Sequence, residues 1–189
     1  MTETPNPHII DADTLTGGLR PIRRVVLALG SNLGDRAANL QGALNALADT
    51  PELHIVGVSP IYENPAIGSP DESPDFLNAI VVADTTLQAR TILERALAVE
   101  DAFGRVRTVR GAPRTLDVDL IVVGDKVIDE EDFVLPHPRA HERSFVLIPW
   151  SHVDPDGEVP GHGKVAELAR SVDTSTLTRV DGLELRLDD

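Results

Sequence analysis

The stretch LDVDLIVV at residues 116–123 decides the fold and carries the most informative charges in the chain. Its branched aliphatic residues, which end at Gly124, predict a β-strand. Because side chains alternate between the faces of a strand, one face should be apolar and contain Leu116, Val118, Leu120 and Val122. The other face should carry Asp117, Asp119, Ile121 and Val123, so two carboxylates lie together at one end of it.

This carboxylate pair is a candidate metal site. Two same-face residues two positions apart are separated by roughly 7 Å at Cα. Ionised carboxylates at that spacing repel each other and are costly to desolvate unless a cation joins them. Oxygen ligands favour Mg²⁺, which takes one or two protein carboxylates and completes its shell with water and substrate phosphates. Asp117 and Asp119 are therefore candidate magnesium ligands.

The segment just before the strand is rich in arginine, with Arg105, Arg107, Arg110 and Arg114. The guanidinium group is suited to bidentate contacts with phosphate. Arginines beside a carboxylate pair for Mg²⁺ are the groups that phosphoryl transfer requires. The alternative is a solvated Asp-x-Asp on an edge strand with the arginines as ordinary surface charge, and these residues alone leave both interpretations open.

Composition narrows the class of protein. The 189-residue chain is long enough for one domain with a sizeable core, and it has no cysteine for disulfides or thiol chemistry. A net charge of −14 argues against duplex nucleic acid or an anionic membrane as the main partner. No apolar stretch approaches the roughly 20 residues of a membrane span, and the first residues lack the apolar region of a signal peptide. A cytoplasmic, monomeric enzyme with small-molecule substrates is expected.

The chain divides into a flexible leader at 1–23, a domain at 24–175 and a C-terminal strand or tail at 176–189. Earlier strands are predicted at 25–29, 54–62 and 76–83, and a terminal strand at 182–187. One helix should end before Pro51. A second should open at a capping box formed by Thr85 and Gln88 and close at Gly104. The order β-α-β-β-α-β is that of a ferredoxin-like α+β sandwich, with helices covering one face of an antiparallel sheet.

Other residues have features of a binding site. Phe76 and Asn78 share a strand face, and an aromatic ring beside an amide suits a flat heterocycle, although Phe76 taken alone is better explained as core. His137 is held between two prolines in a loop. Glu100 lies in the last turn of a helix, where a carboxylate opposes the helix dipole, so it is a candidate for an electrostatic role or a plain ion pair. The glycine turn that starts at Gly30 lacks the P-loop pattern and is best explained as structural.

In this order and spacing, the motifs resemble the 6-hydroxymethyl-7,8-dihydropterin pyrophosphokinase family. The resemblance runs from about residue 24 to 155. Its motifs are LALGSNLG at 27–34, SPIYENP at 59–65, PDFLNA at 74–79, GRVR at 104–107, PRTLDVD at 113–119, LPHPR at 135–139 and RSFVL at 143–147.

The resemblance implies a reaction of folate biosynthesis in which ATP donates its β,γ-pyrophosphoryl group to the hydroxymethyl of the pterin and releases AMP. Asp117 and Asp119 match the ligands of two Mg²⁺ ions, and Arg105 and Arg114 match catalytic arginines that hold the triphosphate. Residues that match the ATP side of the family site are Glu100, Arg107, His137 and Arg143. Residues that match the pterin side are Gly30, Asn64, Pro65, Ile67, Phe76, Asn78 and Phe145.

The sequence departs from the family pattern near the arginine-rich loop. Gly111-Ala112 replaces a usual Trp-Gly, and Thr108 and Asp132 stand where some members have basic residues. Weaker ATP binding or slower loop closure is the expected result. A homologue that binds without turnover stays open as an alternative. A single-stranded nucleic-acid module is poorly supported, because only 3% of residues are aromatic and the net charge is −14.

Overall fold

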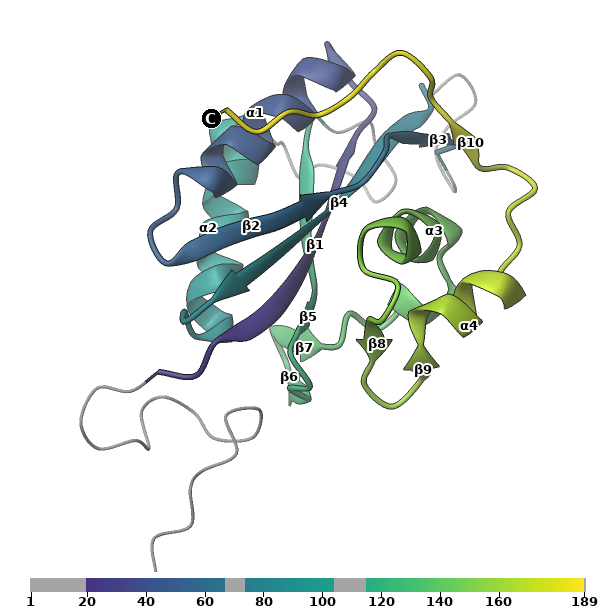
Figure 1. Cartoon of the computed structure of the whole chain (residues 1–189). Coiled ribbons are helices and arrows are strands. Elements are labelled where there is room, and N and C mark those ends of the chain that lie inside the picture. The colour runs from purple at the N-terminus through teal and green to yellow at the C-terminus, as the bar shows by residue number, and fades with distance from the viewer. Residues whose placement is uncertain (1–19, 67–73, 104–114, 189) are drawn as a thin grey trace, which may run out of the picture.

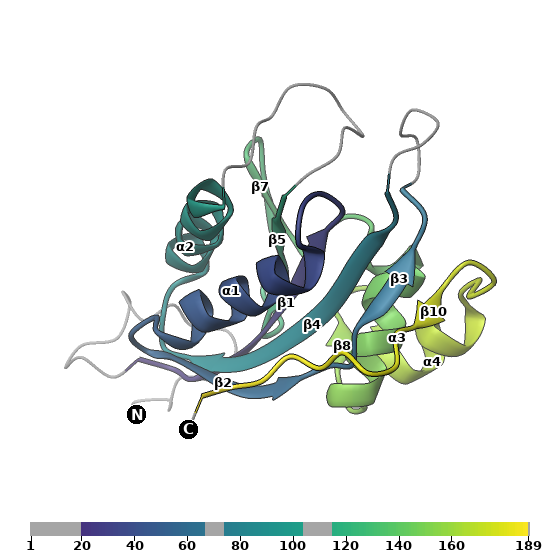
Figure 2. The ribbon, with the colours of Figure 1, turned by 90° about the horizontal axis from the view of Figure 1, so that it is seen from above.

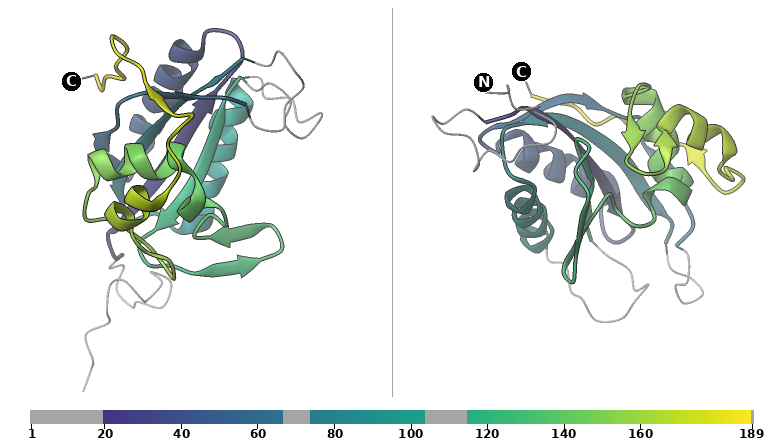
Figure 3. Two further views of the ribbon diagram at one scale, coloured as in Figure 1. Left: turned by 90° about the vertical axis from the view of Figure 1, so that its right-hand side faces the viewer. Right: turned by 90° about the horizontal axis from the view of Figure 1, so that it is seen from below.

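The computed structural model describes residues 20–66, 74–103 and 115–188 (Figure 1). A central antiparallel sheet separates two helical layers, with α1 and α2 on one face and α3 and α4 on the other (Figure 3). The elements in chain order are β1 (Arg23–Ser31), α1 (Arg36–Ala48), β2 (Leu53–Val58), β3 (Tyr62–Asn64), β4 (Phe76–Thr85), α2 (Ala89–Ala102), β5 (Asp117–Val123), β6 (Ile128–Glu130), β7 (Phe133–Leu135), a 3-10 helix (Ala140–Glu142), α3 (Ser144–Val153), β8 (Glu158–Val159), β9 (Gly163–Lys164), α4 (Val165–Ser171) and β10 (Thr178–Arg179).

The main sheet has the order β10-β3-β4-β1-β5, and β2 also pairs with β4. Residues 54–62, predicted as one strand, form two strands that lie in succession along β4 (Figure 2). Between them the Ser59 hydroxyl accepts a hydrogen bond from the Ile80 amide at 2.8 Å. Pro60 has no N–H to offer a ladder, so the strand breaks at this point. The α+β sandwich with ferredoxin-like order is confirmed.

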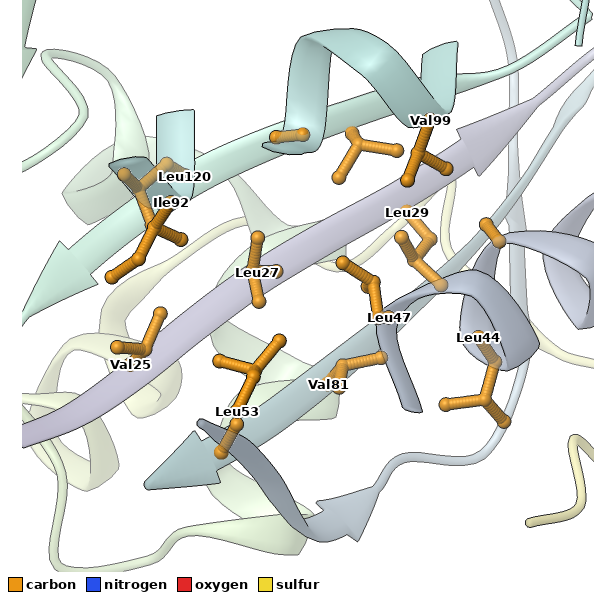
Figure 4. Close-up of a cluster of buried hydrophobic side chains, with 14 of the residues drawn as sticks. Val25, Leu27, Leu29, Leu44, Leu47, Leu53, Val81, Ile92, Val99 and Leu120 are labelled. Carbon is orange, nitrogen blue, oxygen red and sulfur yellow. The ribbon is translucent and has the colours of Figure 1, made fainter. Parts of the chain in front are cut away.

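Two cores lie on opposite faces of the sheet. The first packs β1, β4 and β5 against α1 and α2, and Figure 4 shows Leu27, Leu47 and Ile92 meeting there. The second includes Ile80, Val82 and Trp150, together with residues of α3 and α4. The prediction that helices cover one face was therefore wrong. The central strands are apolar on both sides, and α3 removes the second side from water.

The predicted alternation along β5 holds only to Ile121. In the pairing with β1, Leu120 lies opposite Leu27 and Val122 lies opposite Val26, so one residue of β5 is skipped. This bulge places Val122 in the second core and Val123 in the first, contrary to prediction. Because the bulge follows the carboxylates, the predicted faces of Asp117 and Asp119 are kept.

The capping box predicted at Thr85 is absent. Thr85 ends β4, where its hydroxyl donates to the Glu52 carbonyl at 2.6 Å and accepts from the Leu87 amide at 3.0 Å. Gln88 is the N-cap of α2 and makes no side-chain capping bond. The predicted C-terminal residue of this helix, Gly104, lies outside the described residues.

The strand predicted at 182–187 is also wrong. Strand β10 pairs with β3 just before this segment and takes the available strand edge. The Gln41 side chain instead binds the backbone of Arg186, donating to its carbonyl at 2.7 Å and accepting from its amide at 3.0 Å. Within the described ranges, no helix has the length and apolar character needed to cross a membrane.

Candidate active site

Strand register brings one predicted carboxylate and the predicted amide into one row. Asp117 on β5 lies opposite Gly30 on β1, and Gly30 lies opposite Asn78 on β4. Residues directly opposite each other in antiparallel strands point to the same face. Neighbouring strands are about 4.8 Å apart, so Asp117 and Asn78 stand about 10 Å apart across Gly30. The row therefore has an acid at one end and an amide at the other.

Gly30 leaves the sheet open between these two groups. A Cβ added there would lie 3.3 Å from Asn78 Oδ1 and 3.6 Å from Phe76 Cδ1. Any side chain at Gly30 would thus occupy the space beside the amide and the ring. The absence of a side chain makes room for a ligand at this point, which is a more specific role than the structural turn favoured by the residues alone.

The open face is the one that α3 covers. Asp119 lies opposite Ala28, which in turn lies opposite Ile80, and Ile80 belongs to the second core. The carboxylates therefore point toward the α3 side of the sheet. Helix α3 begins at Ser144, directly after Arg143, and Phe145 is its second residue.

The amide side of the site is buried and internally hydrogen-bonded. The Asn78 amide donates to Asn64 Oδ1, and both side chains are almost fully buried. Asn64 lies opposite Phe76 in the β3–β4 pairing, so the predicted amide and ring come together. Pro65 follows Asn64 and is exposed. The amide side is therefore built from residues of strands that pair directly with one another.

Three polar residues that the sequence analysis did not single out support this side. Arg36, at the start of α1, binds Glu63 of β3 and the Asp75 carbonyl, both at 2.8 Å. The Asn32 amide donates to the Pro74 carbonyl at 3.2 Å. Asn32 and Glu63 fall inside the quoted motifs, so their position there was the available signal. Together these bonds tie β1, α1 and β3 to the segment that enters β4.

Arg143 supplies the positive charge of the site, and His137 lies beside it. The Arg143 guanidinium stacks over the Phe145 ring, with Cζ 5.5 Å from the ring centroid. Burial lowers the pKa of Arg143, while the charges of Asp119 and Asp117 act in the opposite direction. A guanidinium that interacts electrostatically with both carboxylates can hold an anion beside a metal that these carboxylates bind.

His137 is a neutral hydrogen-bonding group at pH 7. Burial, with Arg143 and Arg139 nearby, lowers the pKa of His137 to about 4. Its Nδ1 accepts from the Arg139 amide at 3.3 Å, which leaves the ring proton on Nε2 as a donor. The His137 amide itself donates to the Ile121 carbonyl at 2.8 Å, so the loop is fixed against β5.

Glu100 supports the carboxylate pair from the opposite side of β5. Its side chain is 2% exposed, and Oε1 accepts from the Val118 amide at 2.8 Å. Val118 lies between Asp117 and Asp119, so this bond fixes the backbone that spaces the two carboxylates. The predicted role near Arg105 or Arg107 stays a prediction, because both arginines lie outside the described residues.

A cavity of about 260 Å³ adjoins the carboxylates between α2, β5 and the β6–β7 hairpin. Apolar side chains of α2 and the hairpin line it together with the polar groups of Glu100, Asp119, Asp132 and His137. The lining residues are Leu93, Leu97, Glu100, Val118, Asp119, Leu120, Asp132, Phe133, Val134, His137 and Pro138.

The donor set fits magnesium. Asp117 and Asp119 are half-buried, and the described residues contain no group of three or more His, Cys, Asp or Glu placed to hold a metal. Two half-buried carboxylates, one of which lines the cavity, match the requirement of an ion that takes its other ligands from water and phosphate. Arg105, Arg107, Arg114, Ile67, Thr108 and the Gly111-Ala112 pair all lie outside the described residues.

The fold and the site define an α+β protein that combines a carboxylate pair, a buried amide and cationic groups at one end of its sheet. The chain belongs to the 7,8-dihydro-6-hydroxymethylpterin-pyrophosphokinase (HPPK) family, whose model matches residues 26–155. The family resemblance stated from the motifs is thereby confirmed.

Individual relatives support the same family assignment. A 2-amino-4-hydroxy-6-hydroxymethyldihydropteridine pyrophosphokinase of Methylorubrum extorquens is 41% identical over 158 residues, which cover 84% of this chain and 99% of the relative. The enzyme of that name from Mycobacterium tuberculosis is 44% identical over 146 residues, covering 72% of this chain and 75% of the relative. The structure of wild-type Plasmodium falciparum HPPK-DHPS with pterin and p-hydroxybenzoate gives a TM-score of 0.61 at 16% identity. That alignment covers 81% of this chain but 43% of the longer one, and it supports the fold alone.

Proposed function

We propose that this chain transfers pyrophosphate from ATP to the hydroxymethyl group of 6-hydroxymethyl-7,8-dihydropterin, giving the pterin diphosphate and AMP in folate biosynthesis. Membership of the family supports the reaction. The observation that carries the assignment of the site is the row Asp117–Gly30–Asn78, which sets an amide and a carboxylate on either side of an open glycine.

The pterin would bind over Gly30. The amides of Asn78 and Asn64 can exchange their mutual hydrogen bond for bonds to the polar edge of the heterocycle. Phe76 lies beside the open space, and we expect Phe145 to cover the other face of the ring. In this pose the hydroxymethyl group points along the row toward Asp117.

The nucleotide would approach from the other side. The apolar walls of the cavity along α2 suit a flat base, and the part of the cavity at Asp119 and His137 suits the phosphates. His137 would donate from Nε2, and Arg143 would offer its guanidinium to the triphosphate. Arg105, Arg107 and Arg114 are proposed to complete the cationic surround.

Asp117 and Asp119 would hold the two expected Mg²⁺ ions. Magnesium bound there would reduce the negative charge of the triphosphate and so lower the barrier to attack. Glu100 keeps the two carboxylates at a fixed spacing through the Val118 amide. Arg143 adds positive charge on the same side of the sheet.

The chemical step forms one bond and breaks one. The hydroxymethyl oxygen attacks the β-phosphorus, the bond from that phosphorus to the α,β-bridging oxygen breaks, and that oxygen leaves with AMP. The hydroxyl proton passes to solvent. Positioning of the two substrates and neutralisation of charge would supply most of the rate enhancement.

Phosphorus NMR of the protein with ATP, Mg²⁺ and the pterin tests the proposal. AMP together with a pterin diphosphate is the expected result. ADP in place of AMP would mean γ-phosphoryl transfer and a wrong reaction. Pterin binding without any product would favour a non-catalytic homologue.

Two accompanying predictions need their own tests. Measuring the size of the active protein in solution tests the prediction that it is a monomer. Fractionating its source cells tests the prediction that it is cytoplasmic.

A further inference from the structure

The cavity beside Asp119 runs along α2, and Arg90 lies one turn before the first α2 residue that lines it. Leu93, Leu97 and Glu100 line it from α2, and Arg90 lies three residues before Leu93 on the same side of the helix. The opposite wall is the β6–β7 hairpin, which projects from the edge of the main sheet (Figure 3). Arg90 therefore lies next to the cavity, beside its α2 wall, and contacts two of the hairpin residues that line it.

Arg90 joins α2 to this hairpin through polar contacts. Its Nη1 lies 3.2 Å from Asp132 Oδ2, and its Nη2 binds Glu130. Its Cζ lies 5.3 Å from the centre of the Phe133 ring. Asp132 and Phe133 both line the cavity, so a single side chain holds the wall in place from across the opening.

The charge of the hairpin gives this arrangement a consequence for an anionic ligand. Residues 129–132 are all acidic. Two of them, Glu130 and Asp132, share the guanidinium of Arg90, which lowers the pKa of Asp132. Without Arg90, the Asp132 carboxylate at the cavity wall and the nearby Glu130 carboxylate would both lose this compensating charge. A nucleotide triphosphate entering it would meet like charge within about one Debye length.

We propose that Arg90 is a positioning residue for nucleotide binding: it holds the β6–β7 hairpin against α2 and compensates Asp132 and Glu130, so that the cavity accepts an anionic nucleotide. This inference rests on the proposed function, because it assigns the cavity to the nucleotide. It also gives Asp132, which stands where some family members have a basic residue, a partner that offsets its charge. Arg90 need not touch the ligand to act in this way.

Exposed ion pairs contribute little to stability, and Arg90 is 45% exposed. The expected effect is therefore on nucleotide affinity and not on folding. Arg90→Ala should raise KM for ATP roughly three- to tenfold through uncompensated repulsion. It should leave kcat and KM for the pterin unchanged. High salt should shrink the difference, since screening weakens interactions between exposed charges.

Arg20→Ala is a matched control. Arg20 is also an exposed arginine, 3.7 Å from Glu52, and its loss changes the net charge by the same amount. It should leave KM for ATP unchanged. Arg90→Lys should lie between wild type and Arg90→Ala, because lysine keeps the charge and loses the fork that spans two carboxylates. Adding Asp132→Asn to Arg90→Ala should recover most of the lost affinity.

Equilibrium binding of α,β-methylene-ATP with Mg²⁺ separates the two hypotheses, since it needs no turnover. Weaker binding by Arg90→Ala, partial recovery by the double variant and an unaffected Arg20→Ala would support the inference, even if no AMP forms and the proposed reaction fails. Equal affinity of Arg90→Ala and wild type at low salt would overturn it. So would a double variant that binds no better than Arg90→Ala.

Discussion

The two sides of the site are built in different ways. On the amide side, Gly30, Asn64 and Asn78 are buried on adjacent paired strands, and their positions follow from the register of the sheet. On the nucleotide side, α2, β5 and the β6–β7 hairpin meet around a cavity, and exposed ion pairs of Arg90 join two of them. The amide side is therefore preorganised, whereas the nucleotide side should respond to salt and to surface charge.

The largest expected effect comes from Asp117, which lies in the row with the amide and is also a proposed ligand of the metal that the nucleotide phosphates would meet. Asp117→Asn should lower kcat by roughly a hundredfold or more, because the metal would lose a charged ligand. The fold should persist, since Asp117 is half-buried near the end of its strand. Steady-state rates at saturating Mg²⁺ measure this change. Asp125→Asn, on an exposed turn after the same strand, is the control and should be neutral. An unchanged rate in Asp117→Asn would show that the carboxylates do not hold the metal.

Substitutions of Glu100 test whether the nucleotide side also contains a rigid part, namely the backbone at Val118 that this side chain holds. Glu100→Ala leaves the buried Val118 amide without this acceptor, which should cost about 1–3 kcal/mol of unfolding free energy. Glu100→Gln keeps an acceptor oxygen and should retain more of the stability. Both should lower kcat, about tenfold for alanine, because the spacing of Asp117 and Asp119 loosens. Urea unfolding and rates on the same samples give the two values. A stable alanine variant with full activity would contradict this role.

Gly30→Ala tests the preorganised side alone. The new Cβ would lie 3.3 Å from Asn78 Oδ1, and the amide must then move by a few tenths of an ångström. We expect KM for the pterin to rise roughly three- to tenfold, because a misplaced buried amide leaves hydrogen bonds unmade. KM for ATP, measured in the same variant, serves as the internal control. Equal increases in both KM values would mean that the two sides are not independent.

The contrast also explains what the sequence could predict. Alternation along residues 116–120 is local, so the faces of Asp117 and Asp119 followed from it directly. The bulge at Ile121 depends on pairing with β1, which no local pattern encodes. Leu183, Leu185 and Leu187 alternate as in a strand, yet β10 already occupies the edge of β3. The contact between Arg90 and Asp132 joins positions 42 apart and has no sequence signature.

The smallest predicted effect comes from protonation of His137, which makes both the stability of the fold and nucleotide binding depend on pH. The pKa of His137 is lowered to about 4 in the folded chain, below its ordinary value of 6.5. Between these pH values the unfolded chain binds more protons, so His137 contributes a loss of stability as pH falls from about 6.5 toward 4. NMR titration of the imidazole, assigned by the signal lost in His137→Asn, should give a midpoint near 4. A nucleotide bound beside His137 should raise that midpoint, because phosphate charge favours the imidazolium. A midpoint that pterin raises and nucleotide leaves unchanged would place His137 on the wrong side of the site.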